Sequence, residues 1–328
     1  MAEIIRRQIK TGIICAALLS LMIFDLAGCT TSKKIFTIGI LVSVSSHSPA
    51  IEGFKNGLSE LGYVEGTDVK YIYYGIVENN PETIDAEINR LISQDIDILL
   101  SLGNESALRA RKATEGTGIP VLFTLVSRPV EYGLVKSLRQ PGGNATGVTN
   151  IDSSTKALEF LKIIIPGLKK VYLPYNPDDD ISLISITDAD KAASQLGIEL
   201  ILQEVHSVEE AVECIKNLPK DVDAIFRVPS PTLDGKNSEL SQAAIARGLP
   251  MASRVPLDKA VLMTYSDDPY IIGKQTARLA HELEQGIKPA DLPVENSETF
   301  LTINLDTAGK IGLNIPDNIL SQARIIIR

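Results

Sequence analysis

Strand-like and helix-like segments alternate along this chain, and that alternation constrains its fold more than any other feature of the sequence. The aliphatic and β-branched run over residues 36–42 predicts a buried strand. Ser48-Pro49 predicts the start of a helix that ends near Gly62. Three strands and two helices follow: strands 69–76, 96–100 and 120–126, and helices 81–94 and 106–114. This βαβαβαβ order predicts a parallel sheet with helices on both faces.

The same alternation restarts after residue 150. It predicts helices 155–165, 184–196, 208–218 and 238–247, and strands 171–175, 198–205, 224–228 and 250–254. We therefore expect an α/β protein of two similar Rossmann-like lobes with parallel sheets, joined by a hinge. Our candidate for that hinge is the Gly-rich turn over residues 141–144 with the segment that follows it through Val148 to Asp152, because glycine permits large backbone rotations. An ordinary tight turn is the alternative.

The N-terminus has the order of an export signal: basic residues, an apolar stretch over residues 12–24, then small residues. After Asp25 comes Leu26-Ala27-Gly28-Cys29, which resembles the lipobox of a bacterial lipoprotein. We predict a signal peptide over residues 1–28 and a lipidated tether over residues 29–34, with Cys29 carrying the lipid. A transmembrane anchor is the alternative, but a span needs about 20 apolar residues and Asp25 interrupts the run.

The net charge and the cysteine content exclude one class of binding partner and one kind of covalent cross-link. The formal net charge of -9 argues against nucleic acid, because phosphate binding needs clustered Lys and Arg. Cys214 is the one cysteine beyond the proposed lipid site, so no disulfide forms within the mature domain. It falls in an amphipathic helical pattern, where a buried and unreactive thiol is expected. The length that remains after residue 28 suits two lobes better than one core.

Polar residues follow most of the predicted strands. Ligands of open α/β sheets bind at the carboxyl ends of the strands, so two facing lobes would line a cleft with hydroxyls, amides and helix N-termini. A helix cap is the alternative role for each single Ser or Asn. The candidates at these strand ends are Ser43, Ser45, Ser46, Gly103, Asn104, Ser127, Arg128, Tyr175, Asn176, Pro229 and Ser230.

No catalytic or cofactor motif stands out in the sequence. It has no Gly-x-Gly-x-x-Gly after the first strand, no P-loop and no Gly-x-Ser-x-Gly elbow. His47, His206 and His281 lie in separate segments without metal-ligand spacing. No pair of carboxylates suggests a general acid and base. We therefore predict a non-enzymatic protein with no cofactor and no metal.

Three groups of segments carry a family resemblance. They are 53–58 with 61–66, 133–138 with 141–148, and 288–294 with 303–308 and 315–316. As an ordered set they resemble the ABC transporter substrate-binding proteins that include the tryptophan-binding lipoproteins. The resemblance covers essentially the whole mature chain. It implies the type I periplasmic-binding-protein fold, no catalysis, and partnership with an ABC permease and ATPase.

Two departures from the family pattern affect the site. Where the family usually has Asp-Pro-Val, this chain has Arg128-Pro129-Val130, and a guanidinium can fork onto a carboxylate. Arg128 is thus our candidate for binding an anionic solute group, and a surface pair with Glu131 is its alternative. The family's small-residue turn is Gly103-Asn104 here. The resemblance adds Tyr265 to the ligand candidates, because the family often has Tyr there near the cleft; packing at a lobe edge is the alternative role of Tyr265.

Together these features predict a lipid-anchored, extracytoplasmic solute-binding protein, a monomer, that delivers an amino acid or related amphipathic or anionic metabolite to an ABC importer. The alternative is a binding protein that signals ligand occupancy to a membrane receptor. A hydrolase is disfavoured because no nucleophile and base are paired. We expect the N-terminal lobe at 35–150 plus about 267–292, and the C-terminal lobe at 151–266 plus about 293–328.

Overall fold

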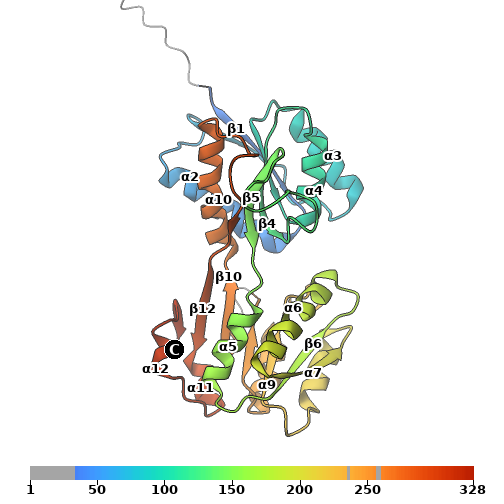
Figure 1. Ribbon diagram of the computed structural model, residues 1–328, viewed down its shortest axis with the longest axis vertical. Coiled ribbons are helices and arrows are strands. Elements are labelled where there is room, and N and C mark those ends of the chain that lie inside the picture. Colours follow the sequence, from blue (N-terminus) through green and yellow to red (C-terminus); the bar gives the residue numbers. More distant parts are fainter. Residues whose placement is uncertain (1–33, 235–236, 256–259) are drawn as a thin grey trace, which may run out of the picture. The chain divides into compact units, whose positions relative to one another are not determined.

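The computed structural model describes residues 34–234, 237–255 and 260–328. Phe36–Arg328 form one compact unit, which contains two α/β lobes, each built on its own sheet (Figure 1). The predicted signal peptide and the lipid-site candidate Cys29 lie outside the described residues. In the part of the chain that the structure describes, none of the helices combines the length and apolar character that a membrane crossing requires.

The first lobe contains a six-stranded sheet in the order β11-β5-β4-β3-β1-β2, in which neighbouring strands pair in parallel. Every residue of β3 is buried, and only one residue of β1 is partly exposed. Such strands lack polar alternation because helices cover both faces of a parallel sheet. The strands are β1 (Phe36–Val42), β2 (Val69–Ile72), β3 (Ile98–Leu102), β4 (Val121–Ser127), β5 (Ala145–Asn150) and β11 (Glu295–Asn296).

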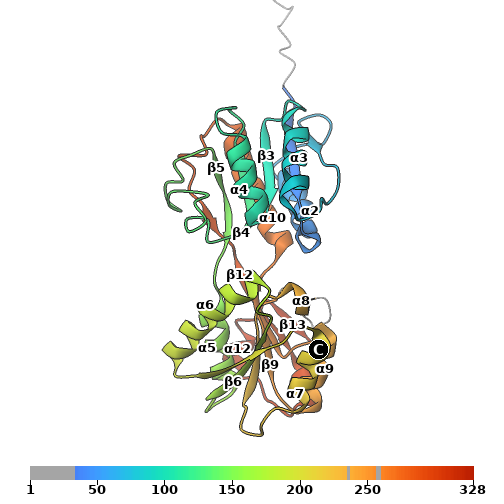
Figure 2. The ribbon, with the colours of Figure 1, turned by 90° about the vertical axis from the view of Figure 1, so that its right-hand side faces the viewer.

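Two pairs of helices cover this sheet (Figure 2). α2 (Ser48–Glu60) and α10 (Pro269–Glu284) share one apolar cluster with the sheet. α3 (Pro81–Ile92) and α4 (Asn104–Ala113) contribute to a separate cluster. The apolar residues of α3 recur at helical spacing and are buried, so the sequence pattern alone determines which side of that helix faces the sheet.

Helices α2 and α10 lie far apart in sequence and approach each other through glycine. A Cβ atom at Gly53 would lie 1.8 Å from the carbonyl oxygen of Tyr270. A Cβ atom at Gly273 would lie 2.0 Å from the carbonyl oxygen of Ala50. Backbone meets backbone at this contact, so neither position has room for a side chain.

The second lobe contains a seven-stranded sheet in the order β13-β12-β10-β9-β8-β6-β7. Its neighbouring strands are parallel except for β10 and β12, which pair antiparallel. The strands are β6 (Lys170–Tyr175), β7 (Glu199–Glu204), β8 (Ala224–Arg227), β9 (Met251–Ser253), β10 (Met263–Asp267), β12 (Thr299–Asn304) and β13 (Ile325–Ile327).

Helices also form two groups around the second sheet. α5 (Ser154–Ile164), α6 (Asp180–Leu196), α11 (Leu305–Lys310) and α12 (Asp317–Leu320) contribute buried residues to one apolar cluster. The second cluster contains side chains of α7 (Val208–Lys216), α8 (Pro231–Asp234) and α9 (Asn237–Ala246). The two lobes thus have the same layered construction, as the repeated alternation in the sequence predicts.

The chain passes between the two sheets three times. It leaves the first sheet after β5 and enters α5 at Ser154, returns between β10 and α10 at Asp268, and leaves again after β11 through residues 297–298. The returning segment therefore extends to Asn296, because β11 pairs with β5. Three short connections therefore join the lobes.

The predicted hinge is right in part: its segment up to Asp152 includes the first connection, after β5, but its Gly142–Gly143 turn belongs to none of the three. The turn precedes β5 inside the first lobe, where the Gly142 amide donates to the carbonyl of Ala290 at 3.3 Å. The strand that follows it, β5, pairs with β4 and extends the first sheet. The sequence prediction omitted β5, whose small and polar residues are typical of a linker as well as of a strand.

Candidate functional site

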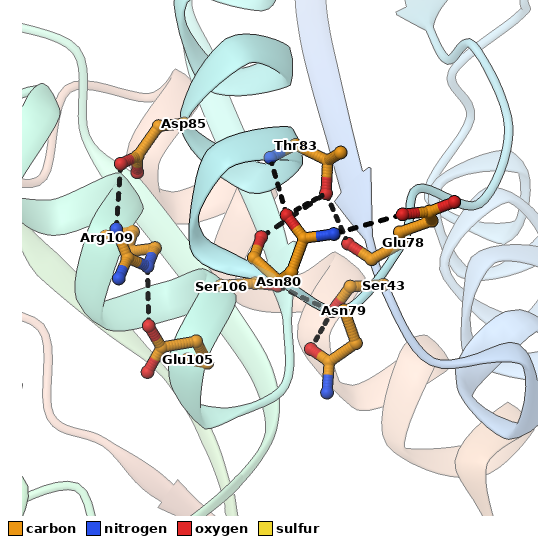
Figure 3. A network of polar contacts seen from close by, with 9 residues as sticks. All are labelled: Ser43, Glu78, Asn79, Asn80, Thr83, Asp85, Glu105, Ser106 and Arg109. Carbon is orange, nitrogen blue, oxygen red and sulfur yellow. Dashed lines mark hydrogen bonds and ion pairs between the residues drawn. The ribbon is translucent and has the colours of Figure 1, made fainter.

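A hydroxyl network lies at the carboxyl end of β1. Ser43 Oγ lies 3.0 Å from Asn79 Oδ1 and 3.0 Å from Ser106 Oγ. Figure 3 shows these contacts, which link the end of β1 to the segment before α3 and to the first turn of α4. Ser43 and Ser106 are both buried. The network fixes three sequence-distant segments at one strand end, and the neighbouring candidates Ser45 and Ser46 lie exposed in the short 3-10 helix η1 (Ser45–His47).

His47 ends that 3-10 helix and lies against Gly103. A Cβ atom at Gly103, whose φ is +93°, would lie 3.1 Å from His47 Cε1. Burial lowers the pKa of His47 to about 4, against a smaller raising effect from the Leu102 backbone carbonyl. Nδ1 itself is buried and makes no hydrogen bond of normal geometry to a described residue. The imidazole is therefore neutral near pH 7 and half-buried, and it packs against the turn at Gly103.

Asn104 ties α4 to the end of β4. Its amide nitrogen donates to the Ser127 carbonyl at 3.0 Å, and its amide oxygen accepts from the Ser127 backbone N–H at 2.9 Å. Both ends of the Asn104 side chain are therefore occupied within the protein. The helix begins at Asn104, two residues before the predicted start, because Gly103 with its positive φ serves as the N-cap.

Arg128 follows β4 and has an unusual backbone, with φ at +51°. Leu125, three residues earlier at a β-bulge, has φ at +55°. Non-glycine residues seldom adopt this region, so the end of β4 is locally strained. The Arg128 guanidinium donates to Asp188 at 2.5 Å and to Glu131 at 3.3 Å. These contacts, with that to Asp188 first, raise the pKa of Arg128.

The second lobe places its candidates around an aspartate. Asn176, just after β6, donates to Thr232 Oγ1 at 2.7 Å. Ser230, after β8, is fully buried and donates to Asp179 at 2.5 Å. Thr232 donates to the same carboxylate at 3.2 Å. Asp179 thus joins the carboxyl ends of β6 and β8, and Pro229 lies half-buried beside it.

The two tyrosine candidates are both partly exposed, and they lie in different surroundings. Tyr175 donates its hydroxyl hydrogen to Glu204 at 3.0 Å, between β6 and the edge strand β7. Tyr265 lies in β10, packs edge-on against Phe160 with ring centroids 5.3 Å apart, and accepts from Thr299 at 2.9 Å. Tyr265 therefore lies next to the connections between the lobes.

A charged cluster at those connections was missed by the sequence analysis. Arg254, just after β9, donates from Nε to Ser153 at 3.1 Å and from Nη1 to Ser154 at 2.9 Å. Its Nη1 also lies 3.0 Å from Asp152 Oδ1. Only 11% of the Arg254 side chain is exposed. Ser153 in turn donates to the backbone carbonyl of Tyr265 at 3.1 Å.

Asp267 completes this cluster at the end of β10. Ser297, in the third connection, donates to its Oδ2 at 3.3 Å. Burial raises the pKa of Asp267 to about 6, and the nearby Arg254 opposes that rise. Burial also lowers the pKa of Arg254, against the nearby Asp152, Asp267 and Asp188 carboxylates. Arg254 thus contacts the first connection directly, and Asp267, whose charge acts on Arg254, contacts the third through Ser297.

Among the described residues, no group of three or more His, Cys, Asp or Glu side chains could hold a metal ion. Cys214 is a free, half-buried thiol on α7. The arrangement is instead rich in paired hydrogen-bond donors and acceptors at the carboxyl ends of parallel strands, where such sheets bind small molecules.

A family model described as "ABC transporter substrate binding protein" matches residues 36–327. The chain belongs to this family. It is 29% identical over 295 residues to the tyrosine-binding protein of Clostridioides difficile, covering 85% of this chain and 81% of that protein.

Solved structures agree on the fold. A ligand-free, open substrate binding protein with adhesive properties from Clostridium difficile has a TM-score of 0.77 at 25% identity, covering 90% of this chain and 99% of the other. An ABC domain from Streptococcus pneumonia in complex with L-Trp has a TM-score of 0.74 at 24% identity, covering 90% and 100%. The predicted fold of two α/β lobes of the periplasmic-binding-protein type is confirmed.

Proposed function

We propose that this chain is the extracytoplasmic solute-binding protein of an ABC importer and that its solute is an amino acid. The family match over Phe36–Ile327 carries the first part. The tyrosine-binding relative and the fold neighbour that holds L-Trp support the second. Arg254 and Asp267 at the lobe connections carry charges of both signs, which complement the two charges of a zwitterionic solute.

Ligand binding would draw the two lobes together around the solute. Each lobe presents polar strand ends, and three short connections join them. A ligand that contacts both lobes favours the closed arrangement by the free energy of those added contacts. The closed form would then present a different surface to the permease. The candidate residues at the strand ends, including Arg128 and Tyr265, are proposed to line the closed site.

A thermal-shift screen tests the solute class. The mature chain would be heated with each of the twenty amino acids, with purines and with small carboxylates. A ligand that binds only the folded state increases the free energy of unfolding, by about 2.7 kcal/mol when the ligand concentration is a hundred times its Kd. The melting temperature rises as a result. A shift with an amino acid and none with purines or simple carboxylates supports the proposal. No shift with any amino acid contradicts it.

We also propose that Cys29 carries a lipid that holds the protein at the cell envelope. Leu26-Ala27-Gly28 before it supports cleavage at that point, and each buried lipid CH₂ contributes about 0.8 kcal/mol to membrane affinity. Mass spectrometry of the native N-terminus should show a diacylglyceryl-modified Cys29. An unmodified cysteine there, or an intact N-terminus, contradicts the anchor and leaves the solute proposal standing.

The protein is proposed to act as a monomer without enzymatic activity or cofactor. A sensor that reports ligand to a membrane receptor is the second candidate, because it would use the same two lobes. Uptake of labelled amino acid by cells separates the two. Deletion of the chain should abolish high-affinity uptake in an importer, and uptake should persist if the chain is only a sensor.

A further inference from the structure

The connections between the lobes hold Arg254, an arginine that is largely but not fully buried and that uses only part of its donors within the protein. Arg254 uses Nε and Nη1 to hold Ser153, Ser154 and Asp152. Its Nη2 makes no hydrogen bond to any residue that the structure describes, yet the atom is not sealed from solvent. Two of the three guanidinium nitrogens are therefore held by the protein, while the Nη2 donor remains accessible.

Asp267, which lies near Arg254, is also only partly hydrogen-bonded within the protein. Asp267 accepts at Oδ2 from Ser297, whereas its Oδ1 accepts from no side chain that the structure describes and also keeps access to solvent. Burial raises the pKa of Asp267 to about 6, so the charged form lacks full compensation in the empty protein. A cation bound beside Oδ1 would supply that compensation.

The sheet register brings these two groups to one edge. β9 pairs in parallel with β10, with Ser253 opposite Thr264, so Arg254 comes level with Tyr265 at the end of the sheet. Ser153 confirms this placement, since its hydroxyl bonds both Arg254 Nε and the Tyr265 carbonyl. Asp267 lies two residues beyond Tyr265 on the same face of β10, about 7 Å along the strand.

We propose that Arg254 and Asp267 bind the two charges of an α-amino acid, with Arg254 Nη2 donating to the α-carboxylate and Asp267 Oδ1 accepting from the α-ammonium. This assignment rests on the proposed amino-acid solute. A carboxylate and an ammonium on one tetrahedral carbon match a donor and an acceptor on neighbouring strands. The N-terminus of α5 is not part of this assignment, because the Ser154 N–H that begins the helix already donates to Asp152 Oδ1 at 3.0 Å.

The competing explanation is purely structural, with Arg254 holding the Asp152–Ser154 segment and Asp267 holding Ser297. Affinity for a single ligand cannot separate the two explanations, since a distorted site binds everything less well. Truncated ligands can. For L-tyrosine, 3-(4-hydroxyphenyl)propionate lacks the ammonium group and tyramine lacks the carboxylate. The corresponding acid and amine of whichever amino acid binds in the screen would serve equally.

Titration calorimetry would compare the wild type, Arg254→Gln and Asp267→Asn with these three ligands. The wild type should prefer the amino acid to each truncated ligand by about 30-fold or more, because each truncation leaves one buried charge unpaired. Arg254→Gln should abolish the preference over the amine and retain the preference over the acid. Asp267→Asn should retain the preference over the amine and abolish the preference over the acid. Each substitution thus cancels only the ligand group that it contacts.

Matched controls come from charged residues next to the site. Asp268→Asn changes the adjacent carboxylate, which caps α10 by accepting from the Tyr270 N–H, and an asparagine oxygen can accept the same bond. Arg278→Gln removes an exposed arginine that pairs with Glu282 and Glu295. Both variants should keep the wild-type ratios among the three ligands.

A measurement on the wild type keeps the test independent of any variant. Between pH 8 and 5, affinity for the amino acid should fall below about pH 6, approaching tenfold per pH unit as Asp267 is protonated. Affinity for the acid that lacks the ammonium group should not fall in this way. The charged groups around Asp267 are Arg254 from the end of β9 and Asp268 at the start of α10; Asp152 and Asp188 act on Arg254.

The outcomes are distinct. If no amino acid binds the wild type, the proposed function fails and the assignment fails with it. If an amino acid binds but either variant weakens all three ligands by the same factor, the structural explanation holds and the assignment is overturned. If a variant does not fold, the pH arm decides: equal pH dependence for the amino acid and for its deaminated acid overturns the role of Asp267.

Discussion

The guanidinium of Arg128 donates to the Asp188 carboxylate at 2.5 Å, and this ion pair joins the loop after β4 in the first lobe to α6 in the second. The pair is partly exposed, with 31% of the Arg128 side chain and 22% of the Asp188 side chain accessible. Arg128 therefore already has a carboxylate partner in the empty protein. A solute anion would have to displace Asp188 or share the guanidinium with it.

Substitution of the pair separates its two possible roles. If it acts as a strut between the lobes, Arg128→Gln, Asp188→Asn and the double variant should change amino-acid affinity by similar factors, below about fivefold, because partly exposed pairs contribute about 0–1 kcal/mol. We expect this result, measured by titration calorimetry.

The alternative from the sequence, that Arg128 binds an anionic group of the solute, makes the opposite prediction. Arg128→Gln would then cost about 30-fold or more. Asp188→Asn would preserve or improve affinity, because it releases the guanidinium for the solute. Unequal single variants of this kind would contradict the strut and establish the anion contact.

The close contact of α2 and α10 predicts a large stability loss from a small change. Gly53→Ala places a methyl group 1.8 Å from the Tyr270 carbonyl oxygen, so the two helices must separate. Overpacking against side chains costs about 1–3 kcal/mol, and a clash with backbone should exceed that range. Urea denaturation would measure the loss.

Gly309→Ala is the matched control, because it makes the same chemical change in a helix where no atom lies within 4 Å. Its expected effect is a gain of about 0.5–1 kcal/mol, since alanine favours helix over glycine. Equal losses from Gly53→Ala and Gly309→Ala would mean that the helix contact does not determine stability.

The sequence predicted the layers of the fold because each layer has a local signal. Helix α3 was expected from apolar residues at helical spacing and begins at Pro81 as predicted. Strand β5 was not expected, because its small and polar residues join the sheet through pairing with β4 and not through local propensity. The same omission led us to include the Gly142–Gly143 turn in the predicted hinge, of which only the part beyond β5, up to Asp152, connects the lobes.

The candidate site was harder to predict than the fold. Ser43 was correctly assigned to a strand end, but nothing local indicates that its hydroxyl contacts Ser106 and Asn79. Arg254 and Asp267 were missed because they follow strands whose adjacency is a property of the second sheet. One sequence signal could have indicated Asp267. Carboxylates at the carboxyl end of a strand are candidates for ligand contact, and the strand of Tyr265 ends in Asp267-Asp268-Pro269.

His47 predicts a loss of stability in acid. Burial lowers its pKa from 6.5 to about 4 in the folded protein, so the unfolded chain binds the proton more readily between those values. This stabilising contribution is complete above pH 6.5 and is lost as pH falls through 4, by up to about 3 kcal/mol. His47→Gln should therefore flatten the pH dependence of unfolding between pH 6.5 and 4. An unchanged slope would show that His47 is already solvated.

Closure of the lobes predicts a change in size. Solute that bridges the two sheets should reduce the radius of gyration measured by small-angle scattering at saturating amino acid. Arg254→Gln, which should bind poorly, provides the control under the same conditions. An unchanged radius for the wild type at saturation would contradict closure while leaving binding intact.

Asp267 predicts a stability effect of the opposite sign to that of His47. Its pKa is about 6 in the folded protein against an ordinary value of 3.8, because burial disfavours the charged form. The folded state therefore binds the proton more tightly, and this contribution to stability is complete below pH 3.8 and lost as pH rises through 6. Asp267→Asn resembles the protonated form at every pH.

The empty Asp267→Asn variant should accordingly be more stable than the wild type at pH 7.5, by up to about 3 kcal/mol, and should show no difference near pH 4. Thermal unfolding of both proteins at the two pH values would measure this. The variant should at the same time lose affinity for the amino acid. Gain of stability with loss of binding is the expected result for a carboxylate that is kept, at a cost to the empty protein, to receive an ammonium group. A variant that is less stable than the wild type at pH 7.5 would show instead that Asp267 holds Ser297 and the third connection in place.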